Sequence, residues 1–161
     1  MKIYVASSWR NPRQPLVVDC LRREGHEVYD FRNPGDVPGF SWSEVKSSLA
    51  PGVPGKGSDW ERVDDYLEMV NHPRAIAGFD SDFTAMHWAD VVVLVLPCGK
   101  SAHLELGWAA GYGKYTAVLL EDPVEPELMY RMTDHLAPSL VDLARWLGSL
   151  TFVPEAGLNR G

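Results

Sequence analysis

The sequence is poor in cysteine, in basic residues and in long apolar runs. Its only cysteines, Cys20 and Cys98, form neither a CxxC pair nor a zinc-type spacing, so neither a disulfide framework nor a metal site is expected. The formal net charge is −7, and no basic stripe is present to neutralise nucleic-acid phosphates. No apolar run has the length of a membrane span or of a signal peptide. These absences favour a cytoplasmic protein that acts on a small molecule or a protein partner, without nucleic acid or membrane.

Glycine-rich phosphate-binding patterns are also missing. The chain has no GxGxxG fingerprint, and the GKS at Gly99–Ser101 lacks the upstream glycine of a P-loop. A nucleoside triphosphatase or a dinucleotide enzyme is therefore not favoured, and we expect no cofactor.

The most informative stretch runs from Asp90 to Lys114. Asp90–Leu96 is apolar and β-branched after its first residue, as in a strand of a parallel sheet that is buried on both faces. Pro97–Gly99 ends this strand, and we expect Ser101 to cap a helix that starts directly afterwards. Glu105 then lies in the first turns of that helix, near the carboxyl end of the strand, where parallel sheets bind ligands.

Two interpretations of Glu105 remain open at this point. Acidic residues are common in first helical turns because they interact favourably with the helix dipole. A capping box does not explain Glu105, because that motif needs a spacing of three and Ser101 lies four residues away. The alternative is a functional carboxylate.

The remaining periodicity predicts a doubly wound α/β fold with a flavodoxin-like, parallel, five-stranded sheet and helices on both faces. The other expected strands are Lys2–Ser7, Glu27–Phe31, Tyr115–Leu120 and Asp134–Pro138, with Leu150–Val153 as a further edge strand. The other expected helices are Pro12–Glu24, Asp59–Val70, Ser81–Trp88 and Ser139–Leu147, while glycines at 25, 111 and 113 act as helix stops. We expect one domain over residues 1–153 and a tail over 154–161.

The topological switch point of this sheet is expected between the first strand and the Asp90 strand. Ligands bind in the crevice at such a point. Side chains from the ends of both strands are candidates for this crevice: Tyr4, Ser7, Ser8, Trp9, Arg10, Gly99, Ser101 and Glu105.

Two further segments carry candidate binding residues. Arg32–Ser58 is a long loop rich in glycine, proline and serine, and it is interpreted either as a surface excursion or as a lid whose Phe40 and Trp42 cover a planar ligand. A turn at Gly78–Asp82 holds Asp80 and Asp82. Ser81 or Asp80 is alternatively a simple helix cap.

The chain resembles the nucleoside 2-deoxyribosyltransferases and the related 2'-deoxynucleoside 5'-phosphate N-hydrolases. The resemblance rests on KIYVASSW at Lys2–Trp9, on the spacing of Asp82 and Asp90, and above all on SAHLELGWAAGYGK at Ser101–Lys114. It covers Lys2–Leu147, and its specific part is the ELGxAxxxGK pattern that begins at Glu105.

The resemblance implies cleavage of an N-glycosidic bond, with transfer to a second base or to water. In this family the matching glutamate, Glu105, is the nucleophile, and the matching tyrosine, Tyr4, orients it. Asp82 matches the aspartate that protonates or anchors the base. These roles fit the chemistry, because positive charge develops at the anomeric carbon and the departing base is a poor anion.

The sequence departs from the family at two positions. Gly99 stands where transferases carry an aspartate for the 5'-hydroxyl and nucleotide hydrolases carry a serine. Ser101, near a helix N-terminus, is a candidate for a 5'-phosphate, which favours a nucleotide substrate. His103 is either a surface histidine or a proton carrier or phosphate partner.

The resemblance also implies a homo-oligomer, with Met132–His135 near a neighbour's site. A second hypothesis from a different class remains, namely a non-catalytic nucleotide-sensing or interaction module on the same fold.

Overall fold

The computed structural model describes residues 1–48, 63–120 and 125–150. The chain separates into two compact units, one made of Met1–Asp30 with the residues from Met86 onward, and one made of Phe31–Ala85. Each unit is described by itself. The expected single domain over 1–153 stays a prediction, and the expected tail lies outside the described residues, as does the expected edge strand Leu150–Val153 apart from Leu150.

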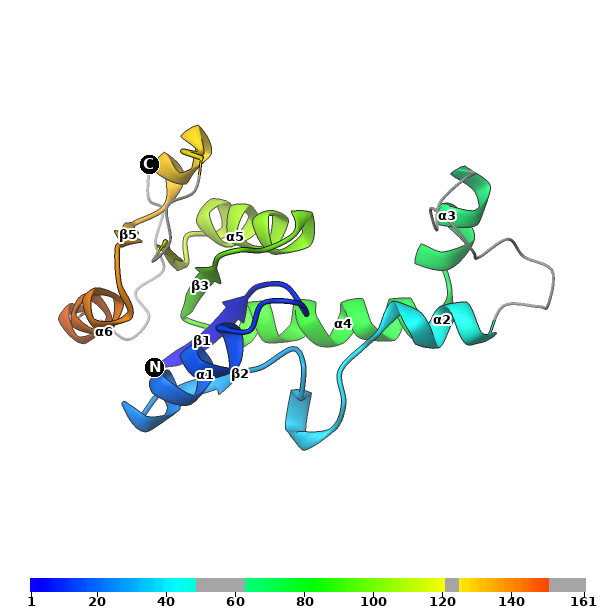
Figure 1. Cartoon of the computed structure of the whole chain (residues 1–161), viewed down its shortest axis with the longest axis horizontal. Helices are drawn as coiled ribbons and strands as arrows, with labels where there is room; N and C mark the ends of the chain where they lie inside the picture. The colour runs from blue at the N-terminus through cyan, green and yellow to red at the C-terminus, as the bar shows by residue number, and fades with distance from the viewer. Residues whose placement is uncertain (49–62, 121–124, 151–161) are drawn as a thin grey trace. The chain divides into compact units, whose positions relative to one another are not determined.

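The first unit is built on a five-stranded parallel sheet with the strand order β2-β1-β3-β4-β5 (Figure 1). Its strands are β1 (Lys2–Ala6), β2 (Glu27–Tyr29), β3 (Val91–Val95), β4 (Tyr115–Leu119) and β5 (His135–Ala137). This order confirms the predicted flavodoxin-like sheet. The switch point lies between β1 and β3, whose pairing runs from Ile3 opposite Val91 to Ala6 opposite Leu94.

Helices cover both faces of this sheet. Alternate strand residues such as Ile3, Val5 and Val93 form one apolar core with α1 (Gln14–Arg23) and α6 (Leu140–Ser149). The helix α5 (Lys100–Tyr112) contacts β1, β3 and β4 from the opposite side, as Figure 1 shows. Because side chains alternate along a strand, Tyr4 and Val92 belong to the face that α5 covers.

The helix ends follow local sequence signals. Gly113 adopts a left-handed conformation (φ +81°) just after α5, and Gly25 does so after α1 (φ +85°), which confirms these two predicted stops. The predicted stop at Gly111 is wrong, because Gly111 lies inside α5. The hydroxyl of Ser139 caps α6 by accepting from the Asp142 amide. The predicted cap at Ser101 is wrong: the N-cap is Gly99, which has an extended backbone, and Ser101 already lies inside α5.

The second unit consists mainly of helical segments, and some of them lie where the sequence predicts a loop or turn. They are the short 3-10 helix η1 (Pro34–Asp36), α2 (Trp42–Ser48), α3 (Val63–Val70) and most of α4 (Pro73–Trp88). The prediction of a structureless Arg32–Ser58 is therefore wrong for η1 and α2, while 49–58 lies outside the described residues. The predicted helix Asp59–Val70 is described from Val63 onward.

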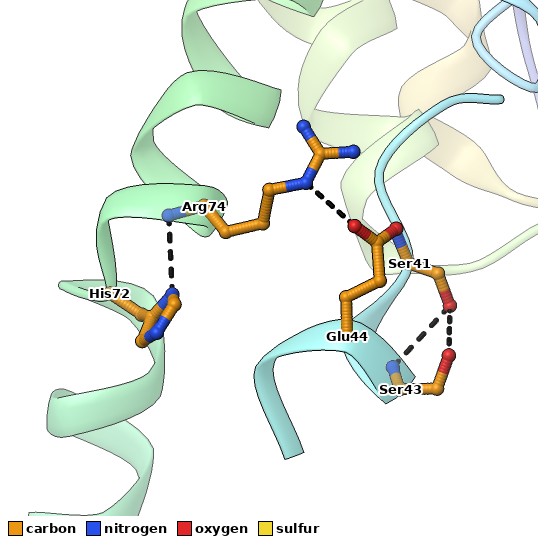
Figure 2. A network of polar contacts seen from close by, with 5 residues as sticks. All are labelled: Ser41, Ser43, Glu44, His72 and Arg74. Carbon is orange, nitrogen blue, oxygen red and sulfur yellow. Dashed lines mark hydrogen bonds and ion pairs between the residues drawn. The ribbon is translucent and has the colours of Figure 1, made fainter. Parts of the chain in front are cut away.

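A capping box explains the start of α2 (Figure 2). The Ser43 amide donates to the Ser41 hydroxyl at 3.3 Å, and the Ser41 amide donates to Oε1 of Glu44 at 3.0 Å. Nε of Arg74, on α4, donates to the second Glu44 oxygen at 2.7 Å. This ion pair joins the starts of α2 and α4.

The helix α4 is continuous through the predicted Gly78–Asp82 turn, so that prediction is wrong. The helix begins at Pro73, where Nδ1 of His72 accepts from the Arg74 amide at 3.1 Å. A Cβ at Gly78 would lie 2.7 Å from Phe40, so Gly78 provides room for this ring inside the helix. Asp80 and Ser81 are interior residues of α4 and cap nothing at its start.

Candidate active site

Glu105 lies in the second turn of α5, just beyond the carboxyl end of β3. Ala102, Leu106 and Ala109 face the sheet and are buried, which places Glu105 at the border of that buried stripe, partly buried itself. At helical spacing it shares a flank of α5 with Trp108. The partly buried position is compatible with a functional carboxylate at the ligand-binding end of the sheet.

The flank that Glu105 occupies continues as an aromatic cluster. Trp108 and Tyr112 are stacked with their ring centroids 4.6 Å apart, and the His87 ring meets both edge-on. Nζ of Lys114 donates to the carbonyls of His87 and Ala89, and burial lowers the pKa of this ammonium. The lysine of the ELGxAxxxGK pattern thus holds the end of α4 against the end of α5.

Tyr4 lies on β1 and is only 1 % exposed. It belongs to the face of the sheet that α5 covers, and its ring stacks on Tyr29 of β2 with centroids 5.4 Å apart. Tyr4 and Glu105 therefore come from β1 and α5 on the same side of the sheet, which the switch-point argument requires. That Tyr4 orients Glu105 stays a prediction.

The loops after β1 and β3 are bonded to each other. The Ser7 hydroxyl donates to the Val95 carbonyl at 2.8 Å, and the side-chain amide of Asn11 donates to the same carbonyl at 3.2 Å and to that of Pro97 at 3.1 Å. Sequence reasoning placed Ser7 in the crevice as a binding residue and missed Asn11. Asn11 belongs to the polar loop between β1 and α1, and no local pattern indicates its burial or its distant partners.

The other predicted binding residues near the carboxyl ends of β1 and β3 differ in their exposure and contacts. Ser8 accepts from the Arg10 amide at 3.2 Å, and Trp9 and Arg10 are exposed. Ser101 is exposed in the first turn of α5, and no side chain caps that turn at Gly99. Their roles in binding stay predictions.

A cavity of about 700 Å³ lies beside α5 on the flank opposite Glu105. Helix positions 103, 107 and 110 line it, together with residues of the 3-10 helix η2 (Leu128–Met132). Its walls are Cys98, Gly99, Lys100, His103, Leu104, Leu106, Gly107, Ala110, Glu127, Met129, Tyr130, Met132 and Thr133. Glu105 is not among them, whereas Gly99 and His103, two of the predicted binding residues, are.

His103 is bonded on both ring nitrogens. Nδ1 lies 3.0 Å from the Gly99 carbonyl oxygen, and Nε2 lies 2.9 Å from the Tyr130 hydroxyl. A carbonyl only accepts, so Nδ1 is the donor to Gly99, and in this tautomer Nε2 accepts from the Tyr130 hydroxyl. Burial, with smaller contributions from Cys98 and Glu127, raises the pKa of Tyr130 to about 12, so this phenol keeps its proton. Sequence reasoning did not find Tyr130, because no local pattern links residues 27 positions apart.

Cys98, at the other edge of this cavity, is not an activated thiol. Burial is the main cause that raises its pKa to about 11, and the negative charge of Glu105 adds to the effect. The thiol therefore stays protonated near neutral pH. The same interaction indicates that the Glu105 carboxylate acts electrostatically on the start of α5.

The remaining predicted site residues belong to the second unit. Asp82 is partly buried on α4 and Asp80 is exposed. Phe40 meets Trp42 edge-on at 4.9 Å and packs against the small core of Val45, Met69 and Ala75. Phe40 thus has a structural role within its own unit. The assignment of these four residues to the substrate site stays a prediction.

The described part of the chain holds neither a metal cluster nor a membrane-spanning helix. Across residues 1–48, 63–120 and 125–150, no three His, Cys, Asp or Glu side chains gather as a metal ion would require. Within the same described residues, no helix has the length and apolar character to cross a membrane.

Solved structures provide the comparison that bears on this geometry. A 2-deoxyribosyltransferase from the psychrotolerant bacterium Bacillus psychrosaccharolyticus superposes with a TM-score of 0.53 at 18% sequence identity, over 89% of this chain and 90% of that chain. The chain has the fold of a 2-deoxyribosyltransferase. The CMP N-glycosidase of Clostridium botulinum covers 92% of this chain and 99% of its own, with 15% identity and a TM-score of 0.48. No protein-family model and no curated protein sequence matches the chain.

Proposed function

We propose that the chain is an enzyme that cleaves the N-glycosidic bond of a nucleoside, a deoxynucleoside or a nucleoside monophosphate. The observation that carries this proposal is the position of Glu105 on α5, at the carboxyl end of β3 and on the same side of the sheet as Tyr4. The fold shared with a 2-deoxyribosyltransferase supports it.

The reaction proceeds in two steps. A carboxylate oxygen of Glu105 forms a bond to C1' of the sugar while the bond from C1' to the base nitrogen breaks, and that electron pair leaves with the base. Asp82 donates a proton to the departing base, which is otherwise a poor anion. A second base or a water molecule then attacks C1' and gives up its proton to Asp82, the bond from C1' to the Glu105 oxygen breaks, and Glu105 returns as a carboxylate. Hydrolysis and transfer differ only in this acceptor.

The substrate's 5' end is expected at the start of α5. Gly99 supplies no side chain for a 5'-hydroxyl, whereas the uncapped first turn and the Ser101 hydroxyl are suited to the oxygens of a 5'-phosphate. This favours a nucleoside monophosphate. Ser7, Ser8, Trp9, Arg10 and His103 complete the proposed binding residues on this unit, while Phe40, Trp42 and Asp80 are proposed on the other.

The enzyme is proposed to act in the cytoplasm as a homo-oligomer, with Met132–His135 near a neighbour's site. Met132 and Thr133 line the cavity beside α5, and Met132 is exposed. The exposed apolar side chain of Met132 is compatible with a subunit contact.

A binding module is the second candidate function. The cavity beside α5 has a volume typical of small-molecule sites, yet Glu105 does not line it. This separation favours ligand binding without chemistry on that flank. Loss of Glu105 distinguishes the two functions, since a binding protein would retain its ligand.

The test is a panel of nucleosides and their monophosphates, with and without a second free base, analysed by liquid chromatography. Wild type is expected to release free base from at least one substrate and to form an exchanged nucleoside if it is a transferase. Glu105→Gln is expected to abolish turnover while keeping the circular-dichroism spectrum. Glu24→Gln, at an exposed position after α1, is the matched control and should retain activity. Absence of free base and exchanged product across the panel would exclude the enzymatic proposal.

A further inference from the structure

We propose that Asn11, together with Ser7, is a positioning residue that holds the loops after β1 and β3 together and thereby sets the entry of α5, the helix that carries Glu105. This inference rests on the proposed function and adds to it the device that keeps the nucleophile in place relative to β1.

The contacts of the Asn11 side chain support this role. Asn11 is 1 % exposed, and its Nδ2 lies 3.0 Å from Oγ of Ser7, 3.2 Å from the Val95 carbonyl and 3.1 Å from the Pro97 carbonyl. Both carbonyls only accept, so the amide hydrogens of Asn11 are shared among these acceptors. The Ser7 hydroxyl gives its own hydrogen to Val95 and therefore accepts from Asn11.

The other end of the side chain is fixed within its own loop. Oδ1 of Asn11 accepts from the Arg13 amide at 2.9 Å, and the backbone amide of Asn11 donates to the Ser8 carbonyl at 3.0 Å. These two bonds hold Asn11 in the turn between β1 and α1. The Asn11 side chain therefore connects the two loops: Nδ2 binds the end of β3 and the loop after it, and Oδ1 binds the loop after β1.

The side-chain bonds of Ser7 and Asn11 begin where the backbone pairing of β1 and β3 ends. The β1–β3 register ends at Ala6 opposite Leu94, and the next carbonyl on β3, that of Val95, receives side-chain donors from Ser7 and Asn11. At a switch point the chains leave the two strands toward opposite faces of the sheet. The side-chain bonds therefore replace the missing ladder at the place where the loops would otherwise separate.

Movement of the loop after β3 would be transmitted to Glu105, the proposed nucleophile, over a short stretch of chain. Pro97, which Asn11 holds, lies two residues before the N-cap Gly99, and Glu105 follows in the second turn of the rigid helix. Catalytic groups that are misplaced by about 1 Å lose roughly 100-fold in rate. A loosened loop is thus expected to lower the rate of the chemical step more than substrate affinity.

Asparagine is the residue type that this position needs. Leucine has a similar size but removes one of the two side-chain donors to the buried Val95 carbonyl and the Asn11 donor to the Pro97 carbonyl, and a lost hydrogen bond at a buried polar group is costly. Aspartate would turn a carboxylate oxygen toward the same carbonyls and add electrostatic repulsion. Asn11→Leu and Asn11→Asp are therefore both expected to release the loop after β3.

The experiment compares wild type, Asn11→Leu and Ser7→Ala with a control of matched stability loss, Val18→Ala, which removes buried atoms from α1 without touching either loop. Amide hydrogen exchange is measured for peptides covering Leu96–Leu104, and kcat and KM are measured for a substrate that wild type cleaves, well below each melting temperature. Asn11→Leu should exchange faster than Val18→Ala in these peptides. It should also lose about 10- to 100-fold in kcat with a small change in KM.

The outcomes separate this inference from the proposed function. If wild type cleaves no nucleoside or nucleotide, the proposed function fails, and exchange at the start of α5 still decides whether Asn11 holds that segment. Exchange equal to that of Val18→Ala would overturn the inference. So would an Asn11→Leu enzyme that keeps the wild-type kcat and differs only in melting temperature, because that result describes a purely structural residue.

Discussion

Nε2 of His103 lies 2.9 Å from the hydroxyl oxygen of Tyr130, so that α5 and η2 are joined at the wall of the cavity between them. The ring planes differ by only 8°, and the opposite nitrogen of His103 faces the Gly99 carbonyl at 3.0 Å. One histidine therefore links the N-cap of α5 to the segment between β4 and β5. The two interpretations of His103 from the sequence did not include this structural role.

Tyr130→Phe is expected to lower the free energy of unfolding by about 1 kcal/mol, the usual net value of one hydrogen bond. The change removes the donor to Nε2 of His103 and leaves the ring in place. Chemical denaturation monitored by fluorescence measures the effect. Tyr112→Phe, on an exposed ring of α5, is the control and should change the unfolding free energy little. Equal effects of the two substitutions would contradict the assigned role of Tyr130.

Cys98 is expected to resist alkylation by iodoacetamide in the folded protein at pH 8, because its pKa is raised to about 11 and only the thiolate reacts. The rate should rise as the pH approaches 11, and the urea-unfolded chain should react fast at pH 8. Glu105→Gln removes a negative charge that disfavours the thiolate, so it should lower the pKa of Cys98 and speed alkylation at pH 9. Mass spectrometry of the Cys98 peptide gives these rates. An unchanged rate in Glu105→Gln would mean that the two groups do not interact.

Glu44 is expected to titrate below its ordinary pKa of 4.5, because the hydrogen bond from Arg74 stabilises its carboxylate. A lowered pKa in the folded state gives stability that is present above the ordinary pKa and is lost as the pH falls through the lowered value. Arg74→Gln should return the pKa of Glu44 toward 4.5, as measured by NMR titration of the side-chain carboxyl carbon. Unfolding of the two proteins should differ at pH 6 and become similar at pH 2. A Glu44 titration that is the same in both proteins would refute this ion pair.

Gly78→Ala is expected to destabilise the protein although alanine favours helices by about 1 kcal/mol over glycine. The new Cβ would lie 2.7 Å from Cβ and Cγ of Phe40, and one of these two atoms lies close to the backbone. Gly148→Ala in α6, where an added Cβ would meet nothing within 4 Å, should instead stabilise by up to about 1 kcal/mol. Thermal unfolding of both variants tests the pair. A stabilised Gly78→Ala would show that Phe40 does not pack there.

Local sequence patterns were sufficient to predict the sheet and to place Glu105 in the helix that follows its central strand, β3. The apolar run before Leu96 is buried on both sides as a strand between helices must be, the left-handed Gly113 ends α5, and Ser139 caps α6. These features depend on residues close together in the chain, where periodicity and backbone preference act directly. The family resemblance of the pattern that begins at Glu105 predicts that this side chain is the nucleophile.

Long-range packing was needed for the features that depend on residues far apart in the chain. Gly78, inside one long helix, leaves room for the Phe40 ring beside it, and Arg74 binds α2 through Glu44. Asn11 became a candidate only when its amide met carbonyls more than 80 positions away. No local pattern records such a partner, because the energy of a buried polar group depends on what the fold brings next to it.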